Sequence, residues 1–257
     1  MPILECQKVS KAYGGLLAVS ELSFTVEPGE IYAIVGPNGA GKTSLFDCIS
    51  GVNPATGGVI KFKDREIQHL RAHQISRLGL ARTFQTTVAF DSQTVLTNVL
   101  VGGSFGRDGE NPALRFTSQA QDDALDALAL CGLSNQQRTL AGQLPVLARK
   151  RLMLATALAM RPQMLLLDEP FGGLNPAERA QMIELIRIVT GTGVTILMIE
   201  HVMKAVQALA DWMLVLHHGE KITEGSPTTV LRDQRVRDVY LGSPAPRHTV
   251  AEPSEAT

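Results

Sequence analysis

The sequence predicts an α/β fold: a largely parallel sheet, a separate antiparallel β region and a helical insertion. The uninterrupted apolar segment IYAIVG (31–36) has the composition of a strand buried on both faces of a parallel sheet. Similar strands are predicted late in the chain, at MLLLD (164–168) and VTILMIE (194–200). The middle of the chain, roughly 89–160, lies between the first of these strands and the two late ones. It contains little strand signal and is predicted to be helical.

The first 64 residues supply the antiparallel β region. ILECQKVS (3–10) and LSFTVEPGE (22–30) are predicted strands, and the second ends in a Pro-Gly turn. GGVIKFKD (57–64) has the pattern of a hairpin or an edge strand. Between them a helix is predicted from Gly41 to about Ser50, where Gly51 and Pro54 end it.

Two further helices are predicted from their starting residues. Residues 118–121 (SQAQ) resemble a capping box, and Leu125 and Leu128 then line one face of a helix that runs toward Gly132. Another helix begins near Pro176, between the two late strands.

The chain is expected to form one domain over residues 1–242. Residues 1–88 and 161–242 make the α/β core with its β region, residues 89–160 make the helical subdomain, and residues 243–257 form a disordered tail.

Composition excludes several classes of protein. The 257 residues carry a formal net charge of -1, so no excess of positive charge indicates a nucleic-acid partner. No uncharged stretch reaches the roughly 18–20 residues that span a bilayer, and the N-terminus lacks the pattern of a signal peptide. Cys6, Cys48 and Cys131 are widely spaced, which fits a reducing compartment and neither a disulfide framework nor a zinc site.

The motif GPNGAGKT (36–43) fits G-x-x-x-x-G-K-[ST], directly after a predicted strand and at the start of a helix. Gly36 and Gly41 let the backbone N–H groups turn inward toward phosphate oxygens, and the helix N-terminus adds its dipole. Lys42 would reach the β- and γ-phosphates, and the Thr43 hydroxyl would ligate Mg²⁺. The sequence therefore predicts a P-loop NTPase (RecA-like) core. The expected nucleotide-binding residues here are Gly36, Pro37, Asn38, Gly39, Ala40, Gly41, Lys42, Thr43 and Ser44.

A pair of acidic residues follows the strand at 164–168. Asp168 would hold Mg²⁺ through water at the carboxyl end of its strand, and Glu169 would polarise the attacking water as general base. On its own, Asp-Glu-Pro could be a plain polar exit from a strand. Together with the phosphate loop, the pair predicts a hydrolytic site.

The order GPNGAGKT (36–43), RTFQ (82–85), MLLLDEP (164–170), GGLNP (172–176) and IEH (199–201) resembles that of the ATP-binding subunit of an ABC transporter, and the resemblance extends to about Gly242. The resemblance implies an ATPase that uses ATP and Mg²⁺. It assigns Gln85 as the loop glutamine that senses Mg²⁺ and the γ-phosphate and faces a membrane partner, and His201 as the switch histidine on the γ-phosphate. It also assigns Tyr13 as the aromatic residue that stacks on adenine near Val19. The implied catalytic residues are Glu169, His201, Gln85 and Lys42, and the implied metal ligands are Thr43, Gln85 and Asp168.

Longer segments narrow the resemblance. SKAYGGLLAV, ISRLGLARTFQ, DEPFGGLNPAE and VYLG are similar to the subunits that serve branched-chain amino-acid importers, and the urea and short-chain amide importers share much of this pattern. The implied partners are transmembrane permease subunits, a second ATP-binding subunit and, indirectly, a solute-binding protein. The implied location is peripheral, on the cytoplasmic face of the inner membrane. Asn175 and Val202 depart from the family pattern, which usually has Asp at both positions.

The segment LPVLA (144–148) stands where the family has the signature L-S-x-G-Q, which closes over the ATP bound by a second subunit. Pro145 lacks both the serine hydroxyl and a backbone N–H, Leu147 replaces a glycine, and Ala148 lacks the glutamine amide. A homodimer would place this segment over both ATP molecules. The sequence therefore predicts an asymmetric heterodimer with an unlike ATP-binding subunit whose signature is intact.

Three other functions compete with this prediction. The chain could be a decayed paralogue or a regulatory subunit that binds ATP with little turnover, although Glu169 argues against decay. It could be an ABC ATPase outside transport, although such proteins usually carry two cassettes or long basic or coiled-coil insertions. It could be a kinase or switch GTPase with a phosphate loop, but the guanine-reading N-K-x-D motif is missing.

Overall fold

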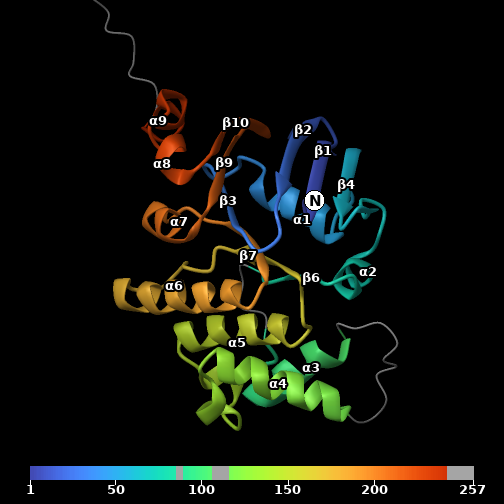
Figure 1. Ribbon diagram of the computed structural model, residues 1–257, viewed down its shortest axis with the longest axis vertical. Coiled ribbons are helices and arrows are strands. Elements are labelled where there is room, and N and C mark those ends of the chain that lie inside the picture. The colour runs from blue at the N-terminus through green and yellow to red at the C-terminus, as the bar shows by residue number, and fades with distance from the viewer. Residues whose placement is uncertain (85–88, 106–115, 242–257) are drawn as a thin grey trace, which may run out of the picture.

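The computed structural model describes residues 1–84, 89–105 and 116–241. Its two sheets lie in the upper part of the molecule as drawn in Figure 1, with a layer of helices below. The α/β class predicted from the sequence is confirmed. The expected tail at 243–257 lies outside the described residues.

The larger sheet has six strands in the order β10-β9-β3-β8-β7-β6. β3 (Ile31–Val35), β7 (Met164–Asp168) and β8 (Thr195–Ile199) are buried at every position, as their uninterrupted apolar sequences predict. They are parallel to one another and to β6 (Leu80–Arg82) and β9 (Trp212–His217), whereas β10 (Glu220–Gly225) pairs antiparallel with β9. Their common carboxyl edge is where the acidic pair and the phosphate loop emerge.

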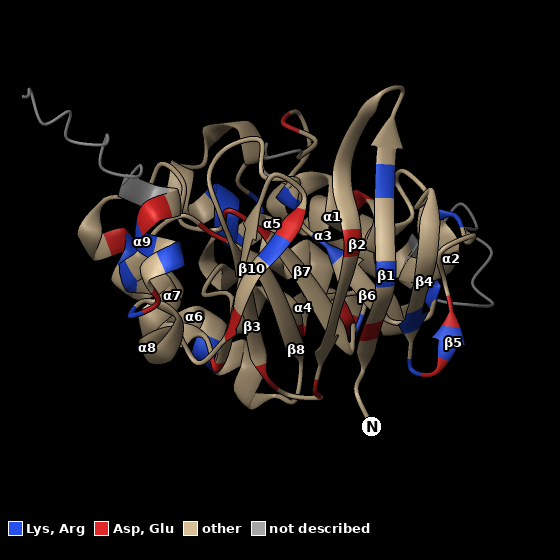
Figure 2. Ribbon diagram, turned by 90° about the horizontal axis from the view of Figure 1, so that it is seen from above, with Lys and Arg blue, Asp and Glu red and all other residues tan. Residues whose placement is uncertain are grey.

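The smaller sheet is antiparallel, in the order β2-β1-β4-β5. Its strands are β1 (Leu4–Tyr13), β2 (Leu16–Val26), β4 (Gly57–Phe62) and β5 (Arg65–Glu66). The strand predicted at 22–30 was placed too late, because β2 begins at Leu16 and pairs back onto β1 through a tight turn. Figure 2 shows this sheet beside the larger one.

Helices cover the parallel sheet and pack against the two clusters of buried apolar side chains that form the core. They are α1 (Lys42–Ser50), α2 (Ala72–Arg77), α6 (Pro176–Gly191), α7 (Met203–Leu209), α8 (Pro227–Val230) and α9 (Gln234–Leu241). The helix predicted near Pro176 begins at that residue.

A group of helices lies between β6 and β7 in the chain: α3 (Val95–Phe105), α4 (Ser118–Leu130) and α5 (Val146–Leu158), with short 3₁₀ turns at Ser134–Gln136 and Ala141–Gln143. In Figure 1 they form the lowest layer, and α5 lies against α6. α5 therefore connects this layer to the strand that carries the acidic pair.

The start of α4 differs from the sequence prediction. The helix is capped by Thr117, whose side chain accepts a hydrogen bond from the N–H of Ala120, so the cap lies one residue before the predicted box. Leu128 is buried, but Leu125 is 43% exposed and does not share its face.

Candidate functional site

One cleft of about 640 Å³ opens at the carboxyl edge of β3. The turn between β1 and β2 lines one side, the loop after β3 and the start of α1 line the floor, and Glu169 and the β9–β10 turn complete it. The lining residues are Tyr13, Leu16, Leu17, Ala18, Asn38, Gly39, Ala40, Gly41, Lys42, Thr43, Ser44, Glu169, His218 and Gly219. This volume lies within the ~300–1,000 Å³ typical of small-molecule sites.

The backbone of the loop needs glycine at two positions. Gly36 has φ 156°, and a Cβ there would lie 2.1 Å from the carbonyl oxygen of Leu216. Gly41 caps α1 with φ 101°, and a Cβ there would lie 2.1 Å from the carbonyl oxygen of Ala18. No L-residue fits either place without moving backbone, so the motif's glycines are fixed by the packing of three neighbouring segments.

Lys42 is buried inside this loop. Its ammonium donates to the carbonyl oxygens of Gly36 at 2.8 Å and Pro37 at 2.9 Å. Burial lowers the pKa of Lys42, and the nearby carboxylates of Glu169 and Asp168 oppose that shift. A desolvated cation at a helix N-terminus is an arrangement that suits an anionic ligand such as a polyphosphate.

Asp168 ends β7 beside a partner that the sequence analysis did not single out. Arg82, whose side chain is only 6% exposed, donates to Oδ2 of Asp168 at 3.1 Å, to Oδ1 of Asp47 at 2.7 Å and to Oγ of Ser50 at 2.9 Å. Burial raises the pKa of Asp168, and Arg82 counteracts part of that rise. The guanidinium therefore ties β6, α1 and β7 together at the foot of the site.

Glu169 and His201 come together from adjacent strands. His201 Nδ1 lies 3.8 Å from Oε1 of Glu169, and the imidazole is the more exposed of the two. Glu169 has φ 48°, an uncommon conformation for a residue with a side chain, and its N–H donates to the carbonyl oxygen of Ile199. This backbone geometry brings the Glu169 carboxyl to the cleft.

Glu200 is a second residue missed by sequence reasoning. It is fully buried, and its carboxylate accepts hydrogen bonds from the backbone N–H groups of Phe171 at 3.1 Å, His201 at 2.8 Å and Val202 at 2.8 Å. Val202, the N-cap residue of α7, has no side-chain oxygen that could accept helix N–H groups, and its own N–H donates to Glu200. Its position at the end of an apolar strand, next to His201, was the available signal.

The residues expected around adenine are only partly in the cleft. Tyr13 lines it and is 44% exposed, with the ammonium of Lys11 4.8 Å from its ring centroid. Val19 is fully buried in the core and is not among the lining residues; Leu16, Leu17 and Ala18 line the cleft there. Gln85 lies outside the described residues. His218, not predicted, also lines the cleft.

The segment LPVLA (144–148) spans the start of α5, where Pro145 and Val146 are exposed and Leu144 is buried. Pro145 is the N-cap residue, and its pyrrolidine ring offers no hydrogen-bonding group. Val146 is 50% exposed, and its Cγ1 would lie 3.8 Å from a Cβ built at Gly173, while Ala148 is buried. The start of this helix therefore presents an apolar surface.

Oxygen donors for a divalent cation are available from two elements. Thr43, at the start of α1, is exposed to the cleft, and Asp168 ends the neighbouring strand β7. A hydroxyl and a carboxylate at a phosphate site are donors that suit Mg²⁺.

Among residues 1–84, 89–105 and 116–241, no helix has both the length and the apolar character of a membrane span.

Comparison with known proteins agrees with this geometry. The family model described as ABC transporter matches residues 19–172, and one described as branched-chain amino acid ATP-binding cassette transporter matches residues 220–246. The high-affinity branched-chain amino acid transport ATP-binding proteins LivG of Escherichia coli K12 and BraF of Pseudomonas aeruginosa are each 36% identical to this chain. Each alignment covers 94% of this chain and 98% of the relative. The lipopolysaccharide export system ATP-binding protein LptB of E. coli is 30% identical, over 94% of this chain and 98% of the relative.

Solved structures give the same result. A nucleotide-free ATP-binding cassette from an ABC transporter superposes with a TM-score of 0.86 at 29% identity, over 95% of this chain and 100% of that one. The ADP conformation of MJ1267, an ATP-binding cassette of an ABC transporter, superposes with a TM-score of 0.85 at 29% identity, with the same coverage. The P-loop NTPase fold and the family predicted from the sequence are thus confirmed: the chain belongs to the ATP-binding subunits of ABC transporters and is an ATPase of that family.

Proposed function

We propose that this chain powers an ABC importer for branched-chain amino acids or related small amides, as one half of an asymmetric heterodimer. One observation supports the asymmetry above all: Lys42 and Glu169 line the cleft and His201 lies beside Glu169, whereas the start of α5 carries LPVLA and no signature serine or glycine. The chain holds the parts that act on its own ATP and lacks those that would act on a partner's ATP.

The proposed cargo rests on the relatives. LivG and BraF are named as branched-chain amino acid transport proteins, and the C-terminal match at 220–246 carries the same description. The implied partners are transmembrane permease subunits and, through them, a solute-binding protein. The chain would lie peripherally on the cytoplasmic face of the inner membrane.

Within the site, each residue has a distinct role toward ATP. Tyr13 would stack on adenine, the loop N–H groups would cradle the phosphates, and Lys42 would exchange its two carbonyl partners for β- and γ-phosphate oxygens. Thr43, Asp168 and Gln85 would hold Mg²⁺, which neutralises phosphate charge when bound. Arg82 would keep the Asp168 carboxylate ionised and oriented.

Hydrolysis would use the carboxylate and imidazole that meet beside the cleft. Glu169 would accept the proton of the attacking water, and His201 would donate a hydrogen bond to the γ-phosphate. The unlike subunit would supply a serine hydroxyl and backbone N–H groups from its own intact signature. Removing one such preorganised donor typically lowers a rate by about 10²–10³. Because LPVLA lacks several, the ATP site that it closes should turn over poorly.

We also propose that residues 1–242 work as one unit. The segment 1–88 with 161–242 would bind ATP, and 89–160 would carry α5 toward the partner's site. The alternative of a decayed paralogue is less well supported, because a subunit without turnover has no need of Glu169 beside His201. An ABC ATPase acting outside transport remains an outcome of the test below.

The test is transport by the complex purified with its membrane permease and reconstituted in vesicles. Lys42→Ala in this chain should reduce ATP-driven uptake at least about 100-fold, because it removes the cation that stabilises the transferred phosphoryl group. The same change in the phosphate loop of the unlike subunit should have a much smaller effect.

Two results would contradict this function. Full uptake with Lys42→Ala, together with loss when the partner lysine is changed, would reverse the assignment of the two sites. Failure of the chain to co-purify with any membrane protein would favour the ABC ATPases that act outside transport.

A further inference from the structure

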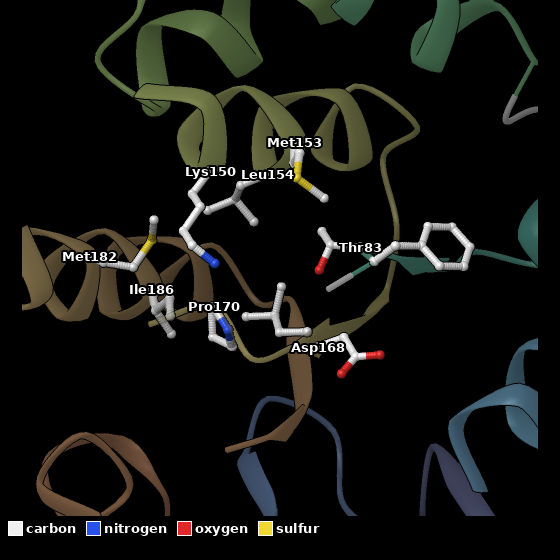
Figure 3. Close-up of a pocket in the computed structure, with 10 residues that line it drawn as sticks. Thr83, Lys150, Met153, Leu154, Asp168, Pro170, Met182 and Ile186 are labelled. Atoms are coloured by element: carbon white, nitrogen blue, oxygen red, sulfur yellow. The ribbon is translucent and has the colours of Figure 1, made fainter. Parts of the chain in front are cut away.

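Lys150 reaches from α5 into the catalytic region of its own chain. Its ammonium donates to the backbone carbonyl oxygen of Glu169 at 3.1 Å. Figure 3 shows the side chain leaving α5 and pointing toward Pro170, in a small cavity between α5, α6 and the end of β7. The contact therefore joins the helix that begins with LPVLA to the residue that carries the catalytic carboxylate.

The surroundings of Lys150 are unusual for a lysine. The side chain is half-buried, and burial lowers its pKa, while the carboxylates of Glu200 and Glu169 favour the charged form. A Cβ built at Gly172 would lie 4.0 Å from the ammonium, so the turn after Glu169 passes close to it. A cation held there is stabilised by the same two acids that shape the site.

The backbone around Glu169 needs such support. Glu169 has positive φ and stands at the point where β7 turns into the next loop. Its N–H donates to the carbonyl oxygen of Ile199, and its carbonyl oxygen accepts from the ammonium of Lys150 and from the N–H of Gly172 at 3.2 Å. Uncommon backbone conformations persist where the surroundings fix them, and here both polar groups of the residue are held.

The second acid extends the network to the switch histidine. The Glu200 carboxylate accepts the N–H groups of Phe171, two residues beyond Glu169, and of His201. If Lys150 moved, the carbonyl oxygen of Glu169 would lose a hydrogen bond, and the Glu200 carboxylate would lose a nearby positive charge. These hydrogen bonds therefore hold the backbone of both Glu169, the proposed general base, and His201, which would contact the γ-phosphate.

We propose that Lys150 is a positioning residue for ATP hydrolysis, which holds the Glu169 turn in register with His201 and couples it to α5. The proposal rests on the function proposed above. Lys150 lies five positions after Pro145, the N-cap residue of the same helix, which corresponds to a rise of about 7.5 Å. Pro145 lies at the proposed contact with the partner. A shift of α5 against the partner's ATP would thus move Lys150 and with it this chain's own Glu169. The altered signature would then pass the closing motion of the dimer to Glu169, although it donates no hydrogen bond to the partner's ATP.

The test compares variants in the complex of this chain with its unlike subunit and permease. Lys150→Met, which keeps the length of the side chain and removes the donor, should lower kcat about 10- to 100-fold while KM for ATP changes less than about threefold, because a misplaced base slows chemistry and leaves nucleotide binding intact. Lys150→Arg, which retains a cationic donor, should recover most of the activity.

Lys221→Met is the matched control. Lys221 also donates to a backbone carbonyl oxygen, that of Ser23 at 2.7 Å, and pairs with Glu224, but it lies on β10 away from Glu169 and His201. Its kcat should match that of the unchanged complex. Binding of a fluorescent ATP analogue to each purified chain reports whether the variant keeps its nucleotide site.

The outcomes separate this inference from the proposed function. If Lys42→Ala removes activity but Lys150→Met leaves kcat unchanged, the inference alone is wrong. Equal losses in Lys150→Met and Lys150→Arg, or loss of analogue binding, would show a purely structural role and overturn it. If Lys42→Ala leaves activity intact, this chain does not hydrolyse ATP, and the proposed function fails together with the role of Lys150.

Discussion

The three cysteine side chains illustrate how burial controls reactivity at single residues. Cys6, Cys48 and Cys131 are free and buried. Burial raises the pKa of Cys48 to about 11 and that of Cys131 to about 12, and it raises the pKa of Cys6 further. At pH 8 only about one Cys48 side chain in a thousand would be the reactive thiolate, even before access is considered.

All three thiols should therefore resist a thiol reagent at pH 8 in the folded chain and react together when the chain is unfolded by denaturant. Since the folded thiols hold their protons to higher pH than unfolded ones, they should also lower the free energy of unfolding as pH rises from about 9 toward 11. Spectrophotometric titration of thiols measures the first effect, and denaturant unfolding at several pH values the second. Rapid labelling of any one thiol in the native protein would contradict this assignment.

Single residues also show what the sequence could and could not predict about the site. The spacing of GPNGAGKT predicted the phosphate loop, because the motif depends on local backbone geometry. Arg82, Lys150 and Glu200 were missed as site residues, because each acts through a residue far away in the chain or through backbone groups. Glu200 follows an apolar strand beside His201, but nothing in the local pattern distinguishes Arg82 or Lys150 from surface charges.

At the scale of elements, Asn175 has a clear structural role, although the family pattern led us to expect Asp at this position. It caps α6: its side chain accepts hydrogen bonds from the N–H groups of Ala177 and Glu178, and the Glu178 carboxylate accepts the N–H of Asn175 in return. This reciprocal capping box satisfies three backbone donors at the start of the helix.

Asn175→Ala should lower the free energy of unfolding by about 1 kcal/mol, because those donors lose their acceptor, whereas Asn175→Asp should cost far less. Urea unfolding of the purified chain followed by circular dichroism measures both. If the aspartate variant is as destabilised as the alanine variant, capping is not what the residue contributes.

Three strands were missed by the sequence analysis, each for its own physical reason. β6 has three residues and depends on pairing with β7 for its conformation, and β10 lies at the sheet edge with a mixed polar pattern. β9 has a short apolar run, but its neighbours give no turn signal before it. The long buried strands β3, β7 and β8 were predicted, because an uninterrupted apolar run is specific to a sheet covered on both faces.

At the scale of the whole molecule, the nucleotide cleft and the start of α5 belong to different layers. The cleft opens where the two sheets meet, and α5 lies in the helical layer on the other side of α6 in Figure 1. In the proposed heterodimer a single chain would not close its own site, and the altered segment LPVLA would act only on a second subunit's ATP. One protein could therefore keep the residues that act on its own ATP while it lacks the signature that would act on a second subunit's ATP.

This account predicts that the purified chain alone hydrolyses ATP very slowly, because any homodimer would close both sites with LPVLA. Restoring three signature side chains with Pro145→Ser, Leu147→Gly and Ala148→Gln should supply the missing donors to both sites. Leu147→Ile serves as a control that changes the same helix turn without adding a donor or removing the side chain.

The most direct measurement is the steady-state ATPase rate of these purified proteins, without partner or permease, at equal protein concentration and saturating MgATP. The triple variant should exceed the unchanged chain at least about 100-fold, and Leu147→Ile should not. An unchanged chain that alone turns over ATP as fast as the restored variant would show that this subunit needs no unlike partner.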